Sequence, residues 1–300
     1  MDEYAQFRDE LIAAGHLVAT GVDGIFGKSA DFEAIVRGIN ASVDSAGADL
    51  DATEVTFPPL IPRTTLEGSD YLRSFPNLIG SVHSFTGGDQ EHRQLLDALE
   101  AGEEWANHLE PTDLALCSAA CHPLYPTVRG VVPTDGRHYS VLGWCFRHEP
   151  SVDPARMQNF RQREYVYLGS ADGAEAFRDL WIERALEVLS SFRLEVESVV
   201  ANDPFFGRTG RLLVAGQRAE ALKFEIVSPI CSREKRTALA SANCHRDHFG
   251  APFDIRTADG EIAHTACVGF GLERITLALL HTHGLDVSSW PPAVRTRLWG

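Results

Sequence analysis

Apolar residues recur with the period of an α-helix in five parts of the chain, which we expect to be helices. These parts are residues 1–14, 29–47, 89–105 and 171–192, and the end of the segment 265–280. The pattern is strongest in 171–192, where acidic residues come early, as the helix dipole favours.

Segments rich in β-branched and aromatic residues predict strands. They cover residues 52–62, 138–150, 159–170, 194–200, 221–230 and 238–250. Most lie in the second half without regular alternation with helices, so we expect an α+β fold, an antiparallel sheet flanked by helices. With no internal repeat and no glycine-rich nucleotide loop of the GxGxxG or GxxxxGK[ST] type, we expect one domain over residues 1–300.

The charge balance restricts the partners. The chain has 27 basic and 42 acidic residues, a net charge of −15. This argues against a long nucleic acid as partner, because gripping many phosphates requires a basic surface. The chain has no apolar run of about 18 residues, so no membrane span is expected, and its acidic start does not resemble a signal peptide. Its six cysteines indicate reduced thiols or metal ligands, and we expect a cytoplasmic enzyme.

The segment TACVGFGLERITLALL, residues 265–280, turns through two glycines into an apolar helix. Glycine permits backbone geometries and close approaches that a Cβ would block. The start of a helix suits anions, and Arg274 adds a forked positive charge there. The segment is therefore either a phosphate-binding corner with Cys267 within reach, or a core helix with a surface arginine.

Two expected strands form a hairpin with a long polar loop. In the expected strand CFRHE, Arg147 and Glu149 project to one face because strand side chains alternate, and in NFRQRE Phe160 and Glu164 also share a face. An arginine, an aromatic ring and two carboxylates suit a nucleotide beside a cationic group. A salt-bridged sheet surface would use the same residues.

Together these motifs resemble a known family. FRHE, a loop and FxxxE are similar to motif 2 of class II aminoacyl-tRNA synthetases, and GFGLER is similar to their motif 3. CHPLYP, FRQREYV, SANCHRDHFG and TACVGFGLER resemble the atypical, zinc-dependent seryl-tRNA synthetases and their shortened relatives, the amino acid:[carrier protein] ligases. The similarity starts near GVDGIFG and includes no tRNA-binding domain.

The resemblance implies an ATP site. Arg147 would hold the α-phosphate, and Arg274 would bind the γ-phosphate end and stack over the base. Glu149 would accept from the adenine amino group, Phe160 would stack on the adenine, and Arg156 in the loop would also contact ATP. Arg147 and Arg274 would be the catalytic residues.

The resemblance also implies a catalytic zinc ion on Cys121, Glu164 and Cys267. Three ligands leave one zinc position open for the amine of a small amino acid, and thiolates with a carboxylate suit zinc. Other ligand sets remain open.

The alternative ligands lie near the expected ones in sequence. Cys117, four residues before Cys121, is one, and Cys244, His245 and His248 in CHRDH are others.

The chain departs from the family at the magnesium site. Ala238 stands where many class II synthetases carry a glutamate that binds Mg²⁺ with ATP. Ser241 and Asn243 come just after it in the sequence, and the resemblance implies that they bind the substrate. Because Mg²⁺ keeps several waters and needs few protein ligands, activity is still expected.

The expected reaction is ATP-dependent formation of an aminoacyl adenylate from a small amino acid, glycine or alanine first and serine next. The aminoacyl group would then pass to the phosphopantetheine thiol of a carrier protein, with the enzyme working as a homodimer. Arg208, Arg211, Arg218 and Lys223 offer a basic docking face for an acidic carrier. The alternatives are a seryl-type tRNA ligase and a non-catalytic paralogue that acts as a binding or regulatory subunit.

Overall fold

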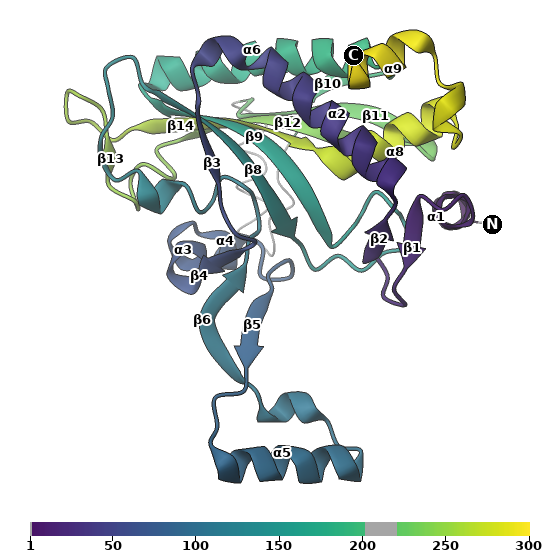
Figure 1. Ribbon diagram of the computed structural model, residues 1–300. Helices are drawn as coiled ribbons and strands as arrows, with labels where there is room; N and C mark the ends of the chain where they lie inside the picture. Colours follow the sequence, from purple (N-terminus) through teal and green to yellow (C-terminus); the bar gives the residue numbers. More distant parts are fainter. Residues whose placement is uncertain (1, 202–220) are drawn as a thin grey trace.

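A twisted sheet of seven strands forms the centre of the computed structural model, which describes residues 2–201 and 221–300. The strand order is β10-β11-β12-β14-β9-β8-β3 (Figure 1). Every neighbouring pair is antiparallel except β3 and β8, which are parallel. The strands are β3 (Thr53–Thr56), β8 (Arg137–Phe146), β9 (Asn159–Gly169), β10 (Glu197–Val200), β11 (Lys223–Ile230), β12 (Ser232–Arg246) and β14 (His264–Gly271). The expected α+β class is confirmed.

One face of the sheet is covered by helices (Figure 1). These are α2 (Ala30–Ala46), α6 (Ala171–Ser191) and α8 (Leu272–His283), with α9 (Pro292–Trp299) beside α2. The main core lies between these helices and the sheet. At its centre Trp181 of α6 is fully buried, with its ring 4.6 Å from Tyr165 and 5.9 Å from Phe270 between ring centroids.

The helix boundaries follow from local chemistry. Ser29 and Ser170 cap α2 and α6 by accepting hydrogen bonds from the N–H groups of Phe32 and Gly173. Helix α8 ends at Gly284, whose φ of 91° suits a glycine.

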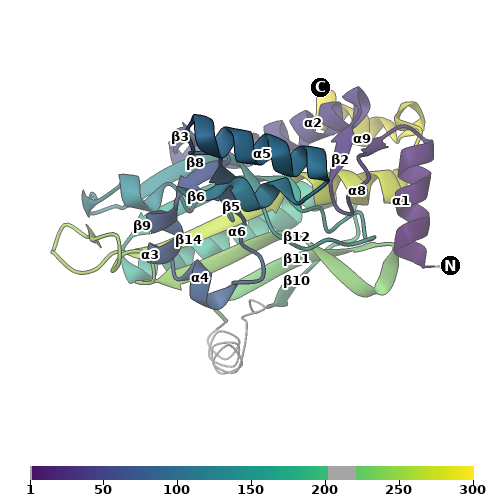
Figure 2. The same cartoon turned by 90° about the horizontal axis from the view of Figure 1, so that it is seen from below.

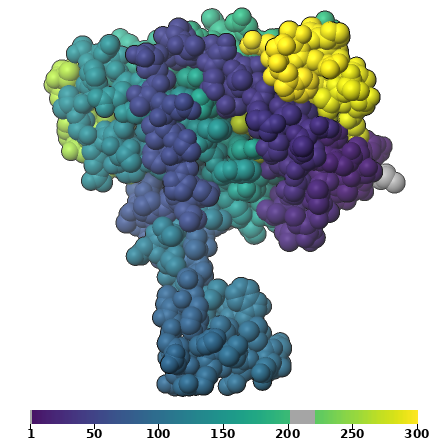
Figure 3. Space-filling view, viewed as in Figure 1, coloured from purple at the N-terminus to yellow at the C-terminus, as the bar shows by residue number. Residues whose placement is uncertain are grey.

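The opposite face of the sheet carries smaller elements. A three-stranded sheet is ordered β4 (Leu60–Pro62), β6 (Glu110–Leu116), β5 (Ser81–Ser84), and the short helices α3 (Arg63–Gly68) and α4 (Tyr71–Ser74) lie beside it. Strands β5 and β6 continue into an arm that ends in α5 (Asp89–Ala101) and stands away from the body (Figure 3). Seen from below, α5 lies in front of the sheet (Figure 2).

The remaining elements lie at the margins. They are α1 (Glu3–Ala13), the hairpin of β1 (Leu17–Ala19) and β2 (Phe26–Lys28), the parallel pair β7 (Gly130–Val131) and β13 (Ile255–Arg256), and the 3-10 turns η1 (Ala48–Leu50), η3 (Tyr125–Thr127) and η4 (Val287–Ser289). A further 3-10 turn, η2 (Trp105–His108), packs against α5 in the arm. None of the helices in residues 2–201 and 221–300 combines the length and apolarity that crossing a membrane requires.

Three expectations differ from the structure. Strand β8 ends at Phe146, so Arg147 and Glu149 lie in the loop that follows it. The expected strand 52–62 divides into β3 and β4 around two prolines. Neither Gly269 nor Gly271 has a positive φ, and a Cβ would meet its nearest neighbour at 3.4 and 3.5 Å, an ordinary contact.

Of the expected docking residues, Arg208, Arg211 and Arg218 lie outside the described residues. Lys223 lies at the start of β11 and is buried.

Candidate active site

A cavity of about 860 Å³ lies on the sheet face opposite α2, α6 and α8. Every site residue expected from the sequence lines it. These residues are Cys121, Arg147, Glu149, Arg156, Phe160, Glu164, Ala238, Ser241, Asn243, Cys267 and Arg274. The alternation of β9 explains part of this gathering, since Phe160, Gln162 and Glu164 all point to the cavity.

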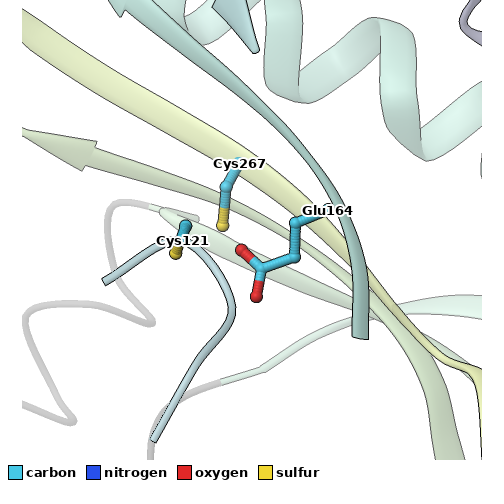
Figure 4. A group of neighbouring side chains, drawn as sticks. All are labelled: Cys121, Glu164 and Cys267. Carbon is cyan, nitrogen blue, oxygen red and sulfur yellow. The ribbon is translucent and has the colours of Figure 1, made fainter. Parts of the chain in front are cut away.

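At one part of the cavity Cys121, Glu164 and Cys267 point toward one another (Figure 4). Each offers a ligand atom, and these atoms lie within 4.8 Å of one another. Cys121 comes from the loop after β6, Glu164 from β9 and Cys267 from β14, and all three are buried.

The surroundings of Glu164 fit a bound cation best. Its Oε1 accepts a hydrogen bond of 3.1 Å from the N–H of Ala120, whereas its buried Oε2 has no hydrogen-bond partner among residues 2–201 and 221–300. A buried carboxylate oxygen without a partner is costly. Two thiols and this carboxylate form a donor set that fits a zinc ion with one open position.

The protons of this group are interdependent. Burial raises the pKa of Glu164 to about 8, and the neighbouring Cys267 adds to the shift. A hydrogen bond from Cys121 lowers the pKa of Cys267, and the same contact raises the pKa of Cys121. A divalent cation favours the deprotonated form of all three.

The alternative ligands have contacts of their own. The Cys117 thiol donates to the carbonyl of Ala119 at 3.0 Å. The Nε2 of His245 is 3.5 Å from the Cys267 sulfur, and its Nδ1 is 3.1 Å from the Thr265 hydroxyl. Among the described residues, Cys121, Glu164 and Cys267 are the one group of three or more with the spacing of a metal site.

The cavity is also lined by an arginine cluster, which consists of Arg147, Arg156 and Arg274. The Arg274 Nε donates to the carbonyl of Ala155 at 2.8 Å, and its guanidinium also donates to the carbonyl of Ala238 at 3.2 Å. Burial lowers the pKa of Arg274, and repulsion by Arg147 and Arg156 adds to the effect. Clustered guanidiniums of this kind suit a polyanion.

Phe160 and Glu149, the other residues expected to bind ATP, line the same cavity. The Arg147 guanidinium lies 5.4 Å from the centroid of the Phe160 ring. Glu149 accepts from Arg156 at 3.4 Å.

Strand β12 contributes Ser241 and Asn243 to the cavity lining. Asn243 pairs with Cys267 across the ladder, and Ser241 pairs with Gly269. The Asn243 side-chain amide lies 3.3 Å from the Ser241 hydroxyl and 3.6 Å from the Cys267 sulfur. Both polar residues therefore border the candidate metal site.

Other cavity residues were not singled out in the sequence. Gln162 accepts from the Cys145 thiol at 2.9 Å and from the N–H of Ala120 at 3.3 Å. Its position between Phe160 and Glu164 in a period of two is the signal that could have identified it. His122 also lines the cavity, and burial lowers its pKa to about 3.

Known relatives are similar over most of the chain. No family model matches it. Amino acid--[acyl-carrier-protein] ligase 2 of Bradyrhizobium diazoefficiens is 45% identical over 280 residues, which are 93% of this chain and 84% of the relative. The chain belongs to the amino acid–[acyl-carrier-protein] ligase family. Ligase 1 of the same organism is 42% identical over 277 residues, 92% of this chain and 85% of the relative.

This enzyme of the amino acid–[acyl-carrier-protein] ligase family also has more distant relatives. The type-2 serine--tRNA ligase of Methanopyrus kandleri is 28% identical over 81% of this chain, which spans half of that relative's length. Among solved structures, M. kandleri SerRS in complex with tRNASec gives a TM-score of 0.82 at 22% identity, over 97% of this chain and 59% of that one. Seryl-tRNA synthetase of Pyrococcus horikoshii, complexed with ATP, gives 0.69 at 17%, over 92% and 58%. These likenesses show that the ligase has the class II synthetase fold.

Proposed function

We propose that this ligase activates a small amino acid with ATP and transfers the aminoacyl group to the phosphopantetheine thiol of a carrier protein. The observation that carries the proposal is that the Cys121–Glu164–Cys267 group and the arginine cluster line one cavity. An amine and a triphosphate can therefore be held side by side. The names of the two relatives at 45% and 42% identity support the carrier as acceptor.

The arginines would serve the adenylation step. Arg147 would hold the α-phosphate and Arg274 the γ-phosphate end, with Arg156 also contacting ATP. Phe160 would stack on the adenine and Glu149 would accept from its amino group. A carboxylate oxygen of the amino acid attacks the α-phosphorus, and the bond from that phosphorus to pyrophosphate breaks. Fixed guanidiniums stabilise the charge that develops on the phosphate.

Cys121, Glu164 and Cys267 would hold the zinc ion. When bound, zinc supplies a Lewis acid that binds an amine and so selects α-amino acids over hydroxy acids. Ser241 and Asn243 would line the space for the amino acid beside it. Ala238 contributes no carboxylate, so Mg²⁺ would be held mainly by the phosphates of ATP.

In the second step the carrier thiol attacks the carbonyl carbon of the adenylate. A carbon–sulfur bond forms, AMP leaves with the electrons of the carbon–oxygen bond, and the thiol proton passes to solvent or phosphate. Glycine and alanine are the proposed substrates, with serine next. We further propose that residues 1–300 act as one catalytic domain, in a cytoplasmic homodimer.

Amino-acid-dependent exchange of labelled pyrophosphate into ATP tests the first step. We expect exchange with one or two small amino acids, and its loss in Cys267→Ala. Absence of exchange with all amino acids would leave a non-catalytic paralogue as the better reading. Retention of zinc and full exchange by Cys267→Ala would refute the metal assignment.

A second candidate acceptor is tRNA, because the relatives of lower identity are named type-2 serine--tRNA ligases. The net charge of −15 argues against it. Adding either purified tRNA or a phosphopantetheinylated carrier protein, and following labelled amino acid, distinguishes the two. We expect a thioester on the carrier and no label on tRNA.

A further inference from the structure

Behind the cavity, on the helix side of the sheet, a buried carboxylate joins β9 to α8. The backbone N–H and the Nε of Arg161 donate to the two carboxylate oxygens of Glu273, at 2.7 and 2.8 Å. Glu273 is 1% exposed. Each of these residues is next in sequence to a cavity residue, because Arg161 follows Phe160 and Glu273 precedes Arg274.

Two further elements complete this ion network, which consists of Lys28, Glu33, Arg161 and Glu273. Both terminal nitrogens of Arg161 donate to the carboxylate of Glu33 in α2, at 2.7 and 2.8 Å. The Lys28 ammonium of β2 lies 3.3 Å from Glu273. Lys28 and Arg161 both lie against the ring of Trp144, at 4.8 and 4.7 Å from its centroid. The network is therefore held by four separate elements and one aromatic ring.

The network begins where the ladder between β9 and β14 stops. The last ladder pair is Gly271 with Gln162, because the chain turns into α8 after Gly271. Phe160 and Arg274 both lie beyond that pair, so ladder hydrogen bonds do not set the distance between them. Beyond this pair β14 no longer accompanies β9, and the N–H of Arg161 donates to the Glu273 carboxylate instead.

We propose that Glu273 and Glu33 are positioning residues that act through Arg161 to hold Phe160 and Arg274 at the separation that ATP requires. The inference rests on the proposed function of the cavity. Neither glutamate lines the part of the cavity assigned to ATP. Their effect would arise because an arginine and a ring that are held in place before ATP arrives lose less freedom when it binds.

The chain supplies a matched control on the same strand. Arg163, two residues along β9 and on the same face, pairs with Asp44 of α2 and with Glu54. Asp44 and Glu33 have side chains of similar exposure, 35% and 30%. Asp44→Asn and Glu33→Gln therefore each weaken one ion pair between β9 and α2, but only Glu33 is linked to Glu273 and so to α8.

The test measures the dissociation constant of ATP by calorimetry, the KM values of ATP and of the amino acid in pyrophosphate exchange, and the melting temperature. We expect Glu273→Gln to weaken ATP binding by about tenfold or more, and Glu33→Gln by about threefold. The KM of the amino acid should stay within about twofold in both variants. Asp44→Asn should lower the melting temperature about as much as Glu33→Gln does, with ATP binding unchanged.

Equal ATP affinity in wild type, Glu273→Gln and Glu33→Gln, with only the melting temperature lowered, would overturn the inference. The same holds if Asp44→Asn weakens ATP binding as much as Glu33→Gln. If Glu273→Gln does not fold, the ATP affinities of Glu33→Gln and Asp44→Asn are compared, and equal affinities would overturn the inference. A wild-type protein that binds no ATP would overturn the proposed function itself, a result distinct from the other two.

Discussion

Zinc should stabilise the folded protein, and Cys267→Ser should abolish that stabilisation. The three proposed ligands come from three separate segments, so a bound ion links the loop after β6 to β9 and β14. The ion would also give Glu164 Oε2 a partner, which the part of the chain that the structure describes does not supply. A ligand that binds only the folded state stabilises it in proportion to the logarithm of its concentration over its dissociation constant.

The size of the effect can be worked out. Zinc at 100 times its dissociation constant adds about 2.7 kcal/mol to the free energy of unfolding. A chain of 300 residues has an unfolding entropy of roughly 0.6 kcal/mol/K near 60 °C. Dividing the two gives a rise of about 4 °C in melting temperature.

The assay is thermal unfolding of chelator-treated protein with increasing zinc, combined with metal analysis of the purified protein. We expect a saturating rise at one zinc per chain for wild type, and none for Cys267→Ser. Cys117→Ser is the matched control, because that buried thiol donates to Ala119 outside the ligand group, and a serine can make the same bond. If Cys117→Ser lost the zinc effect and Cys267→Ser kept it, the ligand assignment would be wrong.

Three further results are expected. Arg147→Lys should lower pyrophosphate exchange by about 100-fold at an unchanged melting temperature, because an ammonium cannot replace a fork of donors at the developing charge. Phe160→Leu should raise the KM of ATP roughly tenfold and leave that of the amino acid unchanged, since it removes base stacking. Hydrogen bonds from Arg161 are the largest cause lowering the pKa of Glu33 from its usual 4.5. The stability from this pair is therefore complete above pH 4.5 and is lost as the pH falls toward the lowered value. Urea unfolding should show the difference between wild type and Glu33→Gln shrinking below pH 4.5, and a difference independent of pH would contradict this.

Much of the fold could be predicted because its signals are local. The helical period of 171–192 and the serine before it are sufficient to define α6. The aromatic and β-branched content of 138–150 and 159–170 is likewise sufficient to predict the hairpin of β8 and β9. The parallel pairing of β3 with β8 depends on contacts between distant segments, and no local pattern encodes it.

In the candidate site too, some features have local sequence signals and others depend on contacts between distant segments. Glu164 and Cys267 lie on neighbouring strands, and alternation places Glu164 on the same face as Phe160. Their proximity to Cys121 came only from the family resemblance, because a loop 43 residues before Glu164 carries no local signal of that contact. The extrapolation of β8 through Arg147 and Glu149 was wrong, since the strand ends at Phe146 and the N–H of Glu149 bonds back to the carbonyl of Arg147 at 2.7 Å.

Alternate residues of β9 point to opposite faces of the sheet, so that one set lines the cavity and the other set contacts the helices. Gln162 and Glu164 face the cavity, while Arg161 and Arg163 bind carboxylates of α2 on the opposite side. A slip of one residue in the ladder would turn both guanidiniums into the cavity and Glu164 away from it, toward the carboxylates that Arg161 and Arg163 now pair with. The carboxylates of α2 oppose such a slip, because a guanidinium turned away would leave each of them without its partner. The ion pairs behind the sheet therefore help to determine which side chains the cavity contains.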